Sequence, residues 1–112
     1  MPCIMLKTNV KLDETRDAIR KDFGEAISLL PGKSERWLCT VLEDGLDVSL
    51  AGSTSPCAMI FVDQYGSANR DACNRLAGRL TDIMEERLHI PPDRVYVAFH
   101  ETGMWAWQGE LF

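Results

Sequence analysis

The second residue of the chain, Pro2, has the most distinctive chemistry. Within a chain, a proline nitrogen is an amide without a proton, whereas at an N-terminus it is a basic secondary amine. An α-amino group has an intrinsic pKa of about 8, and an apolar pocket or a neighbouring cation lowers that value toward neutrality. Removal of Met1 would therefore give this chain a base suited to general base catalysis.

The cysteines and histidines form no recognisable motif. The four cysteines stand at positions 3, 39, 57 and 73, each within or beside an apolar segment. No CxxC pair occurs, so the sequence indicates neither a zinc site nor a redox motif, and no metal or organic cofactor is implied. The spacing favours buried, reduced thiols in a cytosolic protein. We interpret His89 as a helix C-terminal cation and His100 as a surface residue at a strand end.

Length and composition indicate one domain spanning residues 1–112, with 46% hydrophobic and 26% charged residues. A net charge of −5 argues against a nucleic-acid partner, because such binding relies on Lys and Arg that neutralise phosphates. No apolar run approaches the roughly 20 residues needed to span a bilayer. The first residues lack the regions of a signal peptide. The sequence therefore predicts a cytoplasmic protein with no membrane partner.

The segments that must position Pro2 form two similar halves, each a strand, a helix and a second strand. In the first half we expect Asp13 to cap the helix, which Pro31 ends. In the second half Pro91 and Pro92 end the helix. The expected strands are residues 3–8, 37–42, 57–65 and 94–99, with a short extended piece at 48–50, and the helices carry apolar stripes of Ile19, Phe23, Ala26, Ile27 and Leu30, and of Ala72, Leu76, Leu80, Ile83, Met84 and Leu88.

Two tandem β-α-β units predict an α/β fold in which a four-stranded mixed sheet carries two helices on one face. The other face is then left bare. Yet the third strand is apolar on both sides, because Ala58, Ile60 and Val62 alternate with Met59 and Phe61. A soluble monomer rarely exposes an apolar patch of that size, and open sheet edges pair readily. The sequence therefore predicts self-association through the bare face.

Five segments fall in an order that is specific as a set, although each is modest alone. They are Met1 with Pro2, the turn at residues 31–33 (PGK), residues 51–58 (AGSTSPCA), residues 86–96 (ERLHIPPDRVY) and residues 103–112 (GMWAWQGELF). Together they resemble the macrophage migration inhibitory factor family and its tautomerase relatives, from one end of the chain to the other. The resemblance implies that family's fold and a homotrimer, with active sites between neighbouring subunits.

For function, the resemblance implies a keto–enol tautomerase that acts on phenylpyruvate-like α-keto acids. Pro2 is then the catalytic base, and Lys33 matches the lysine that binds the substrate carboxylate. Tyr65 aligns with the position whose backbone amide contacts the same carboxylate. Tyr96 matches an aromatic residue that the adjoining subunit contributes. The remaining implied substrate contacts are Trp37, Trp105, Trp107 and Phe112.

Three departures from the family pattern bear on chemistry. Ala98 stands where the family has an asparagine that reaches a substrate's phenolic hydroxyl, which implies a preference for phenylpyruvate over hydroxyphenylpyruvate. Glu110 adds a carboxylate near the expected pocket mouth, where it would weaken binding of an anionic substrate. The family's CxxC is replaced at residues 57–60 (CAMI), so thiol oxidoreductase activity does not carry over.

Two other functions stay open on the sequence. One is a cytokine-like module that binds a protein receptor, with vestigial or absent tautomerase activity and the leaderless secretion that the resemblance suggests. The other is dehalogenation or decarboxylation, which relatives perform with the same terminal proline. Those relatives usually add an arginine pair or an acidic group near the base, and Arg36 and Glu110 are the only candidates in this chain.

Overall fold

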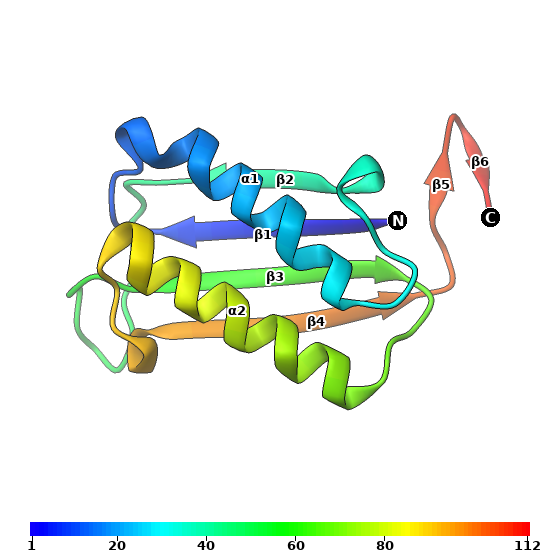
Figure 1. The fold of residues 1–112 in the computed structure, drawn as a ribbon. Coiled ribbons are helices and arrows are strands. Elements are labelled where there is room, and N and C mark those ends of the chain that lie inside the picture. Colours follow the sequence, from blue (N-terminus) through cyan, green and yellow to red (C-terminus); the bar gives the residue numbers. More distant parts are fainter.

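Two β-α-β units, one after the other, build a four-stranded sheet (Figure 1). The computed structural model describes every residue from Met1 to Phe112. Its main elements are β1 (Pro2–Thr8), α1 (Arg16–Ala26), β2 (Cys39–Glu43), β3 (Ala58–Tyr65), α2 (Arg70–Leu88) and β4 (Val95–Thr102), followed by the hairpin strands β5 (Ala106–Trp107) and β6 (Glu110–Leu111). Short 3-10 helices are η1 (Asp13–Thr15), η2 (Ile27–Leu29), η3 (Glu35–Trp37) and η4 (Pro92–Arg94).

The order of strands in the sheet is β2-β1-β3-β4. β1 runs parallel to β2, and β3 runs parallel to β4, whereas β1 and β3 pair antiparallel in the centre. In Figure 1, α1 and α2 lie next to each other across one face of this sheet. The structure thus confirms the predicted α/β fold, a mixed sheet with both helices on one face.

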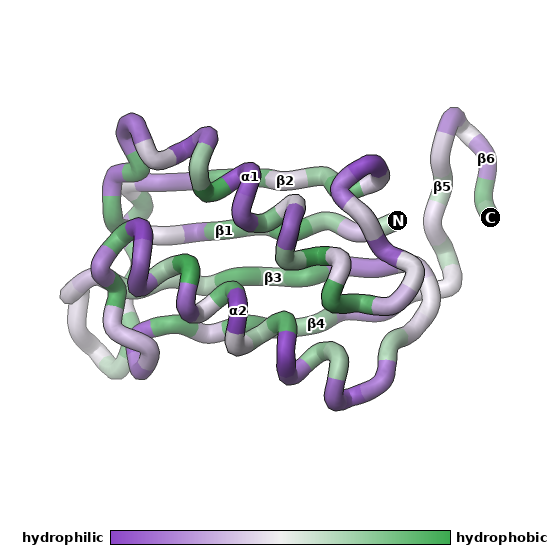
Figure 2. Tube along the Cα trace, viewed as in Figure 1, coloured by the Kyte–Doolittle hydropathy of each residue, from purple (hydrophilic) through white to green (hydrophobic).

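The hydrophobic core lies between the helices and the sheet. Ile4 and Leu6 of β1 and Ile60 and Val62 of β3 are fully buried on the helix side. Every residue of the two predicted helical stripes is buried against them. Figure 2 shows hydrophobic stretches along the strands and recurring along the helices. This packing holds β1 firmly, and with it the position of Pro2.

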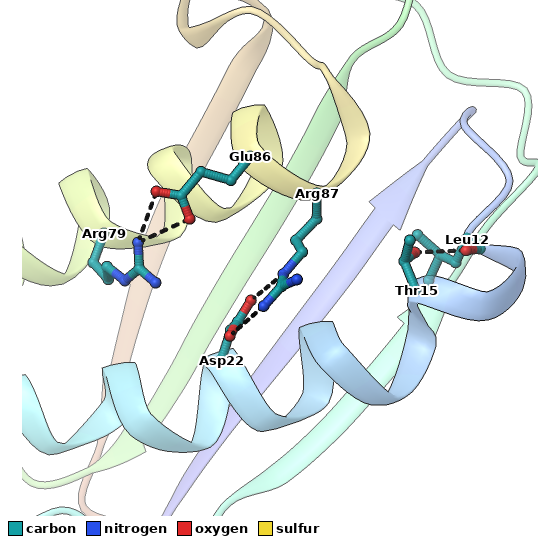
Figure 3. Close-up of polar contacts among 6 residues, drawn as sticks. All are labelled: Leu12, Thr15, Asp22, Arg79, Glu86 and Arg87. Carbon is teal, nitrogen blue, oxygen red and sulfur yellow. Dashed lines mark hydrogen bonds and ion pairs between the residues drawn. The ribbon is translucent and has the colours of Figure 1, made fainter.

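An ion pair joins the two helices (Figure 3). Asp22 of α1 is only 7% exposed, and it accepts hydrogen bonds from two nitrogens of Arg87 in α2, at 2.7 and 3.2 Å. The hydrogen bond from Arg87 and the charge of Asp22 raise the pKa of Arg87. A guanidinium bound through two nitrogens fixes both distance and angle, so this pair sets how α1 lies against α2. The pair between Arg79 and Glu86 joins partly exposed side chains of α2 and adds little.

The start of the first helix differs from the prediction. Asp13 lies in η1 with a φ of 48° and caps nothing, and α1 begins only at Arg16. Asp44, in the turn after β2, binds the segment before the helix instead: its carboxylate accepts the Leu12 N–H at 2.9 Å and pairs with Arg16 at 2.7 Å. The hydrogen bond from Leu12 is the main cause that lowers the pKa of Asp44. The carboxylate that binds the backbone here therefore comes from a residue distant in sequence.

Two predicted strand boundaries were also wrong by more than one residue. Trp37 lies in η3, and β2 begins at Cys39. The extended piece expected at 48–50 lies outside the named strands, and Leu50 forms an isolated bridge with Ser53. β4 continues to Thr102, so His100 lies within the strand rather than at its end. β4 therefore pairs with β3 over the whole length of β3, including the end at which the N-terminus lies.

The sheet face opposite the helices, called the bare face below, presents alternate residues of all four strands. Strand register places on it Cys39 and Val41 of β2, Cys3 and Met5 of β1, Met59, Phe61 and Asp63 of β3, and Tyr96, Ala98 and His100 of β4. These residues are half-buried or exposed, and Tyr96 reaches 59% exposure. Neither helix is long and apolar enough to pass through a bilayer.

Candidate active site

The N-terminus lies at one end of an interior strand of the sheet. Pro2 opens β1, is buried and pairs with Gln64 of β3. A strand tolerates proline at its first position, where the missing N–H is not needed. Met1 extends beyond the strand and brings its amine next to Lys33. Burial, and then the Lys33 ammonium, lower the pKa of this terminal amine.

Lys33 reaches the N-terminus because the chain turns back after η2. Gly32 adopts a φ of 77°, a conformation that glycine takes without strain, and the Lys33 N–H donates to the Leu30 carbonyl at 3.1 Å. From there the side chain runs to the sheet, where Nζ donates to the carbonyl oxygen of Tyr65 at 2.9 Å. Lys33 is therefore held next to Tyr65 and to the N-terminal amine of Met1.

The backbone of Tyr65, the last residue of β3, completes this group. Its N–H donates to the carbonyl oxygen of Met1 at 3.0 Å, while its own carbonyl accepts from Lys33. Lys33 and the Tyr65 amide thus come from separate segments, and both contact Met1, the residue before Pro2.

Aromatic side chains gather at the same end of the molecule. Phe112 packs on Tyr65 with ring centroids 5.3 Å apart, and Trp107 meets Trp37 edge to face at 5.2 Å. Figure 1 shows the β5–β6 hairpin standing beyond the strand ends, close to the N-terminus. The guanidinium of Arg36 lies 5.1 Å from the centre of the Trp37 ring. The C-terminal hairpin thus forms an apolar wall near the group of polar donors.

Trp105 contributes differently from the other aromatic residues. It is half-buried, and its carbonyl oxygen accepts the backbone N–H of Phe112 at 3.0 Å. This bond holds the last residue of the chain against the start of the hairpin. Trp105 therefore helps to position Phe112, which in turn contacts Tyr65.

A cavity of about 330 Å³ opens in the hairpin. Trp107, Glu110 and Phe112 line it, together with Gln108 and Leu111. Glu110 is exposed and pairs with Trp107 across the hairpin. Whether it lies at the mouth of the substrate pocket stays a prediction, because neither Pro2 nor Lys33 lines this cavity.

Replacing Glu110 by Gln is expected to improve the binding of an anionic aromatic ligand. The exchange removes one negative charge from an exposed site and keeps the shape of the side chain. Exposed charges interact weakly, so we expect a decrease in KM of about twofold to fivefold for a carboxylate substrate. The decrease should fade as salt is raised. An unchanged KM at low salt would show that Glu110 lies too far from the bound anion to matter.

Tyr96 and Ala98 lie away from Pro2 within one chain. They pair with Met59 and Phe61 of β3, whereas Pro2 pairs with Gln64 at the other end of that strand. At about 3.3 Å per residue, Met59 lies about 17 Å along the strand from Gln64, and Phe61 about 10 Å from it. One chain therefore does not bring Tyr96 or Ala98 into contact with the donors around Pro2.

The sequence did not reveal a row of ionisable side chains that crosses the bare face. Register aligns Cys39, Cys3, Asp63 and His100 on four successive strands. The His100 Nδ1 lies 3.0 Å from an Asp63 oxygen, and its ring stacks on Phe61 with centroids 5.8 Å apart. No group of three or more metal-ligating side chains forms in the structure. Only the strand register could have revealed this row, because its members are far apart in sequence.

Known proteins resemble this chain along its whole length. The family model "Macrophage migration inhibitory factor (MIF)" matches residues 1–112. The macrophage migration inhibitory factor of Rattus norvegicus is 28% identical over 119 residues, covering 100% of this chain and 99% of the relative. The D-dopachrome decarboxylase of Gallus gallus is 26% identical over 106 residues, covering 94% and 90%.

The fold agrees with these matches. The crystal structure of Leishmania major MIF2 superposes with a TM-score of 0.92 and 26% identity, covering 100% of this chain and 97% of that one. The order of elements, the mixed sheet and the match to the family model all lead to one assignment. The chain belongs to the macrophage migration inhibitory factor family, within the tautomerase superfamily.

Proposed function

We infer that this protein is a homotrimeric keto–enol tautomerase for phenylpyruvate-like α-keto acids, with Pro2 as its catalytic base once Met1 has been removed. One observation carries the proposal: Lys33 and the Tyr65 N–H both meet the first residue of the chain. A cation and an amide donor beside a terminal amine match the parts that base-catalysed proton transfer on a carboxylate substrate requires.

The setting of the N-terminus favours a free base at neutral pH. The amine on Met1 already has a lowered pKa through burial and through Lys33. The Pro2 nitrogen lies one residue further in, at a buried position. The same two causes therefore act on a Pro2 amine, because both burial and a nearby cation disfavour its charged form.

The carboxylate of the substrate has matching donors. In the unprocessed chain the Tyr65 N–H is used by the Met1 carbonyl, and removal of Met1 releases it. Lys33 Nζ supplies a positive charge next to the same residue. A carboxylate can accept from both donors, and charge-assisted hydrogen bonds of this kind are stronger than neutral ones.

The proposed reaction moves one proton and needs no cofactor. The Pro2 amine takes a proton from the carbon next to the keto group, and the electron pair of that C–H bond becomes the carbon–carbon double bond of the enol. The protonated Pro2 then gives its proton to the former keto oxygen. A positioned acid–base group contributes about 10²- to 10⁴-fold to such a step.

The aryl pocket is completed in the proposed trimer. The bare face is apolar over much of its area, and Tyr96 on it is 59% exposed. Tyr96 does not approach Pro2 of its own chain, so a neighbouring subunit is the source that the resemblance implies for this contact. Trp37, Trp107 and Phe112 would supply the remaining aromatic surface.

Ala98 is expected to set the preference between substrates. A methyl group offers no partner to a para-hydroxyl on the substrate ring, and an unpaired buried hydroxyl costs about 1–3 kcal/mol. We therefore expect kcat/KM to favour phenylpyruvate over 4-hydroxyphenylpyruvate by about fivefold to a hundredfold. Ala98→Asn should narrow or reverse that ratio. A wild-type preference for the hydroxylated substrate would mean that another side chain, such as Gln108, hydrogen-bonds the para-hydroxyl.

The proposal is tested by assaying phenylpyruvate tautomerisation with protein whose intact mass shows that it begins at Pro2. Sedimentation equilibrium at micromolar concentration on the same sample is expected to give the mass of a trimer. Activity in that sample supports the proposal. An inactive trimer with a free Pro2 would instead favour the cytokine-like binding module, and a monomer would remove the shared active site.

A further inference from the structure

Two of the four free cysteines are brought together by the fold. Cys3 of β1 and Cys39 of β2 are register partners in the parallel pair, so both side chains lie on the bare face. Neighbouring strands are about 4.8 Å apart, which falls within the Cα separation of 4.4–6.8 Å that disulfides use.

We propose that Cys3 and Cys39 form a dithiol site that a low-molecular-weight disulfide, such as oxidised glutathione, converts into an intramolecular disulfide. The sequence analysis found no redox motif because the partners come from different strands rather than from a CxxC segment. The proposal does not depend on the tautomerase function, since it rests on the geometry of the sheet.

Exposure decides which thiol reacts first. In the single chain Cys39 is exposed whereas Cys3 is half-buried, so Cys39 meets the reagent first. Burial raises the pKa of the Cys3 thiol to about 12, and the nearby Cys39 and Asp63 add to that rise. When Cys39 is held in a mixed disulfide, its contribution to this rise disappears, whereas that of burial remains. Cys3 then becomes the resolving thiol.

The two steps balance in atoms and electrons. The Cys39 thiolate attacks one sulfur of oxidised glutathione, forming a mixed disulfide and releasing one glutathione thiol. The Cys3 thiolate then attacks the Cys39 sulfur, forming the Cys3–Cys39 bond and releasing the second glutathione thiol. Two protein electrons reduce the glutathione disulfide, and the two protein thiol protons end on the two released thiols.

The remaining cysteines provide a matched control. Cys57 is buried and its thiol donates to the Val48 carbonyl at a sulfur–oxygen distance of 3.6 Å. Cys73 lies on α2, which covers the opposite face of the sheet. Neither is a register partner of Cys3 or Cys39. Oxidation should therefore be confined to one pair.

The experiment incubates the processed protein with glutathione mixtures of rising oxidised fraction, traps free thiols by alkylation and records intact mass and linked peptides. We expect the number of alkylated cysteines to fall from four to two, with a loss of two hydrogen atoms in mass and a peptide linking Cys3 to Cys39. Reducing agent should restore all four thiols.

Variants make the assignment specific. In Cys3→Ser, Cys39 should retain one glutathione, because no resolving thiol is present. In Cys39→Ser, Cys3 should remain reduced. A double variant, Cys57→Ser with Cys73→Ser, should still form the disulfide. The proposal is overturned if Cys3 and Cys39 both stay alkylatable under oxidising mixtures, or if the disulfides that form link separate chains or other cysteines.

Discussion

A preparation that retains Met1 is expected to have no tautomerase activity. In that chain the Pro2 nitrogen is an amide and cannot accept a proton. The Tyr65 N–H is also occupied, because the Met1 carbonyl accepts it at 3.0 Å. Base and carboxylate donor are therefore lost together, and the rate should fall by at least about 10²-fold, the lower range of what a positioned base contributes. Phenylpyruvate assays on samples separated by intact mass provide the measurement.

Pro2→Gly, with Met1 removed, is the matched comparison. It keeps a terminal amine at the same place but loses the secondary amine and the rigidity of the ring. Its rate should fall sharply yet stay above that of the chain that retains Met1. Full activity in a sample proven by mass to begin at Met1 would rule out Pro2 as the base.

Replacing Lys33 by Ala is expected to weaken substrate binding and to change the pH profile. The exchange removes a charged donor from the carboxylate, and hydrogen bonds to charged groups contribute about 1.5–3 kcal/mol. KM should therefore rise by about tenfold to a hundredfold. Circular dichroism should remain unchanged, because Lys33 is half-buried at the surface and outside the core.

The pH dependence gives Lys33→Ala a second readout. The Lys33 ammonium is one of the causes that lower the pKa of the Met1 amine, and we expect it to lower the pKa of a terminal Pro2 amine in the same way. Activity requires the free amine, so it rises as pH passes upward through that pKa. Without Lys33 the pKa rises, and the acid limb of kcat/KM against pH should move to higher pH. Lys33→Arg should keep the limb in place, and Lys21→Ala, at an exposed position of α1, should change neither quantity.

Much of the fold could be predicted because its signals are local. Apolar stripes at helical spacing gave both helices, and every stripe residue is buried. Alternating apolar residues gave the strands, and the order of elements gave the tandem β-α-β arrangement. His89 was also placed well: it ends α2 at the C-cap position, with a φ of 57°.

The errors arose where distant residues decide local structure. Asp13 has the side chain of a helix cap, but Asp44 from the turn after β2 binds the Leu12 N–H instead. Trp37 was expected in a strand because it is aromatic, yet it packs edge to face on Trp107 from a 3-10 turn. His100 lies within β4 beside Asp63, which depends on register. No pattern within a short window carries such information.

The candidate site, too, has features that the sequence could predict and features that depend on contacts between distant residues. The resemblance implied roles for Pro2, Lys33 and Tyr65, and the structure places Lys33 and Tyr65 in contact with each other and with Met1. It could not indicate that the Met1 carbonyl accepts the Tyr65 N–H. Nor could it reveal the Cys3–Cys39 pair, because that contact follows from the parallel register of β1 and β2.

The interior position of β1 has a consequence for how the amine is made. β1 is synthesised before the other strands but lies between β2 and β3 in the folded sheet. It therefore cannot pair until those two later strands have been translated. In that interval the nascent end is unpaired and open to an aminopeptidase. Once β3 has paired, the Tyr65 N–H binds the Met1 carbonyl and Pro2 is buried. If the active form begins at Pro2, as we propose, we therefore expect Met1 to be removed more readily before β1 pairs with β3 than afterwards.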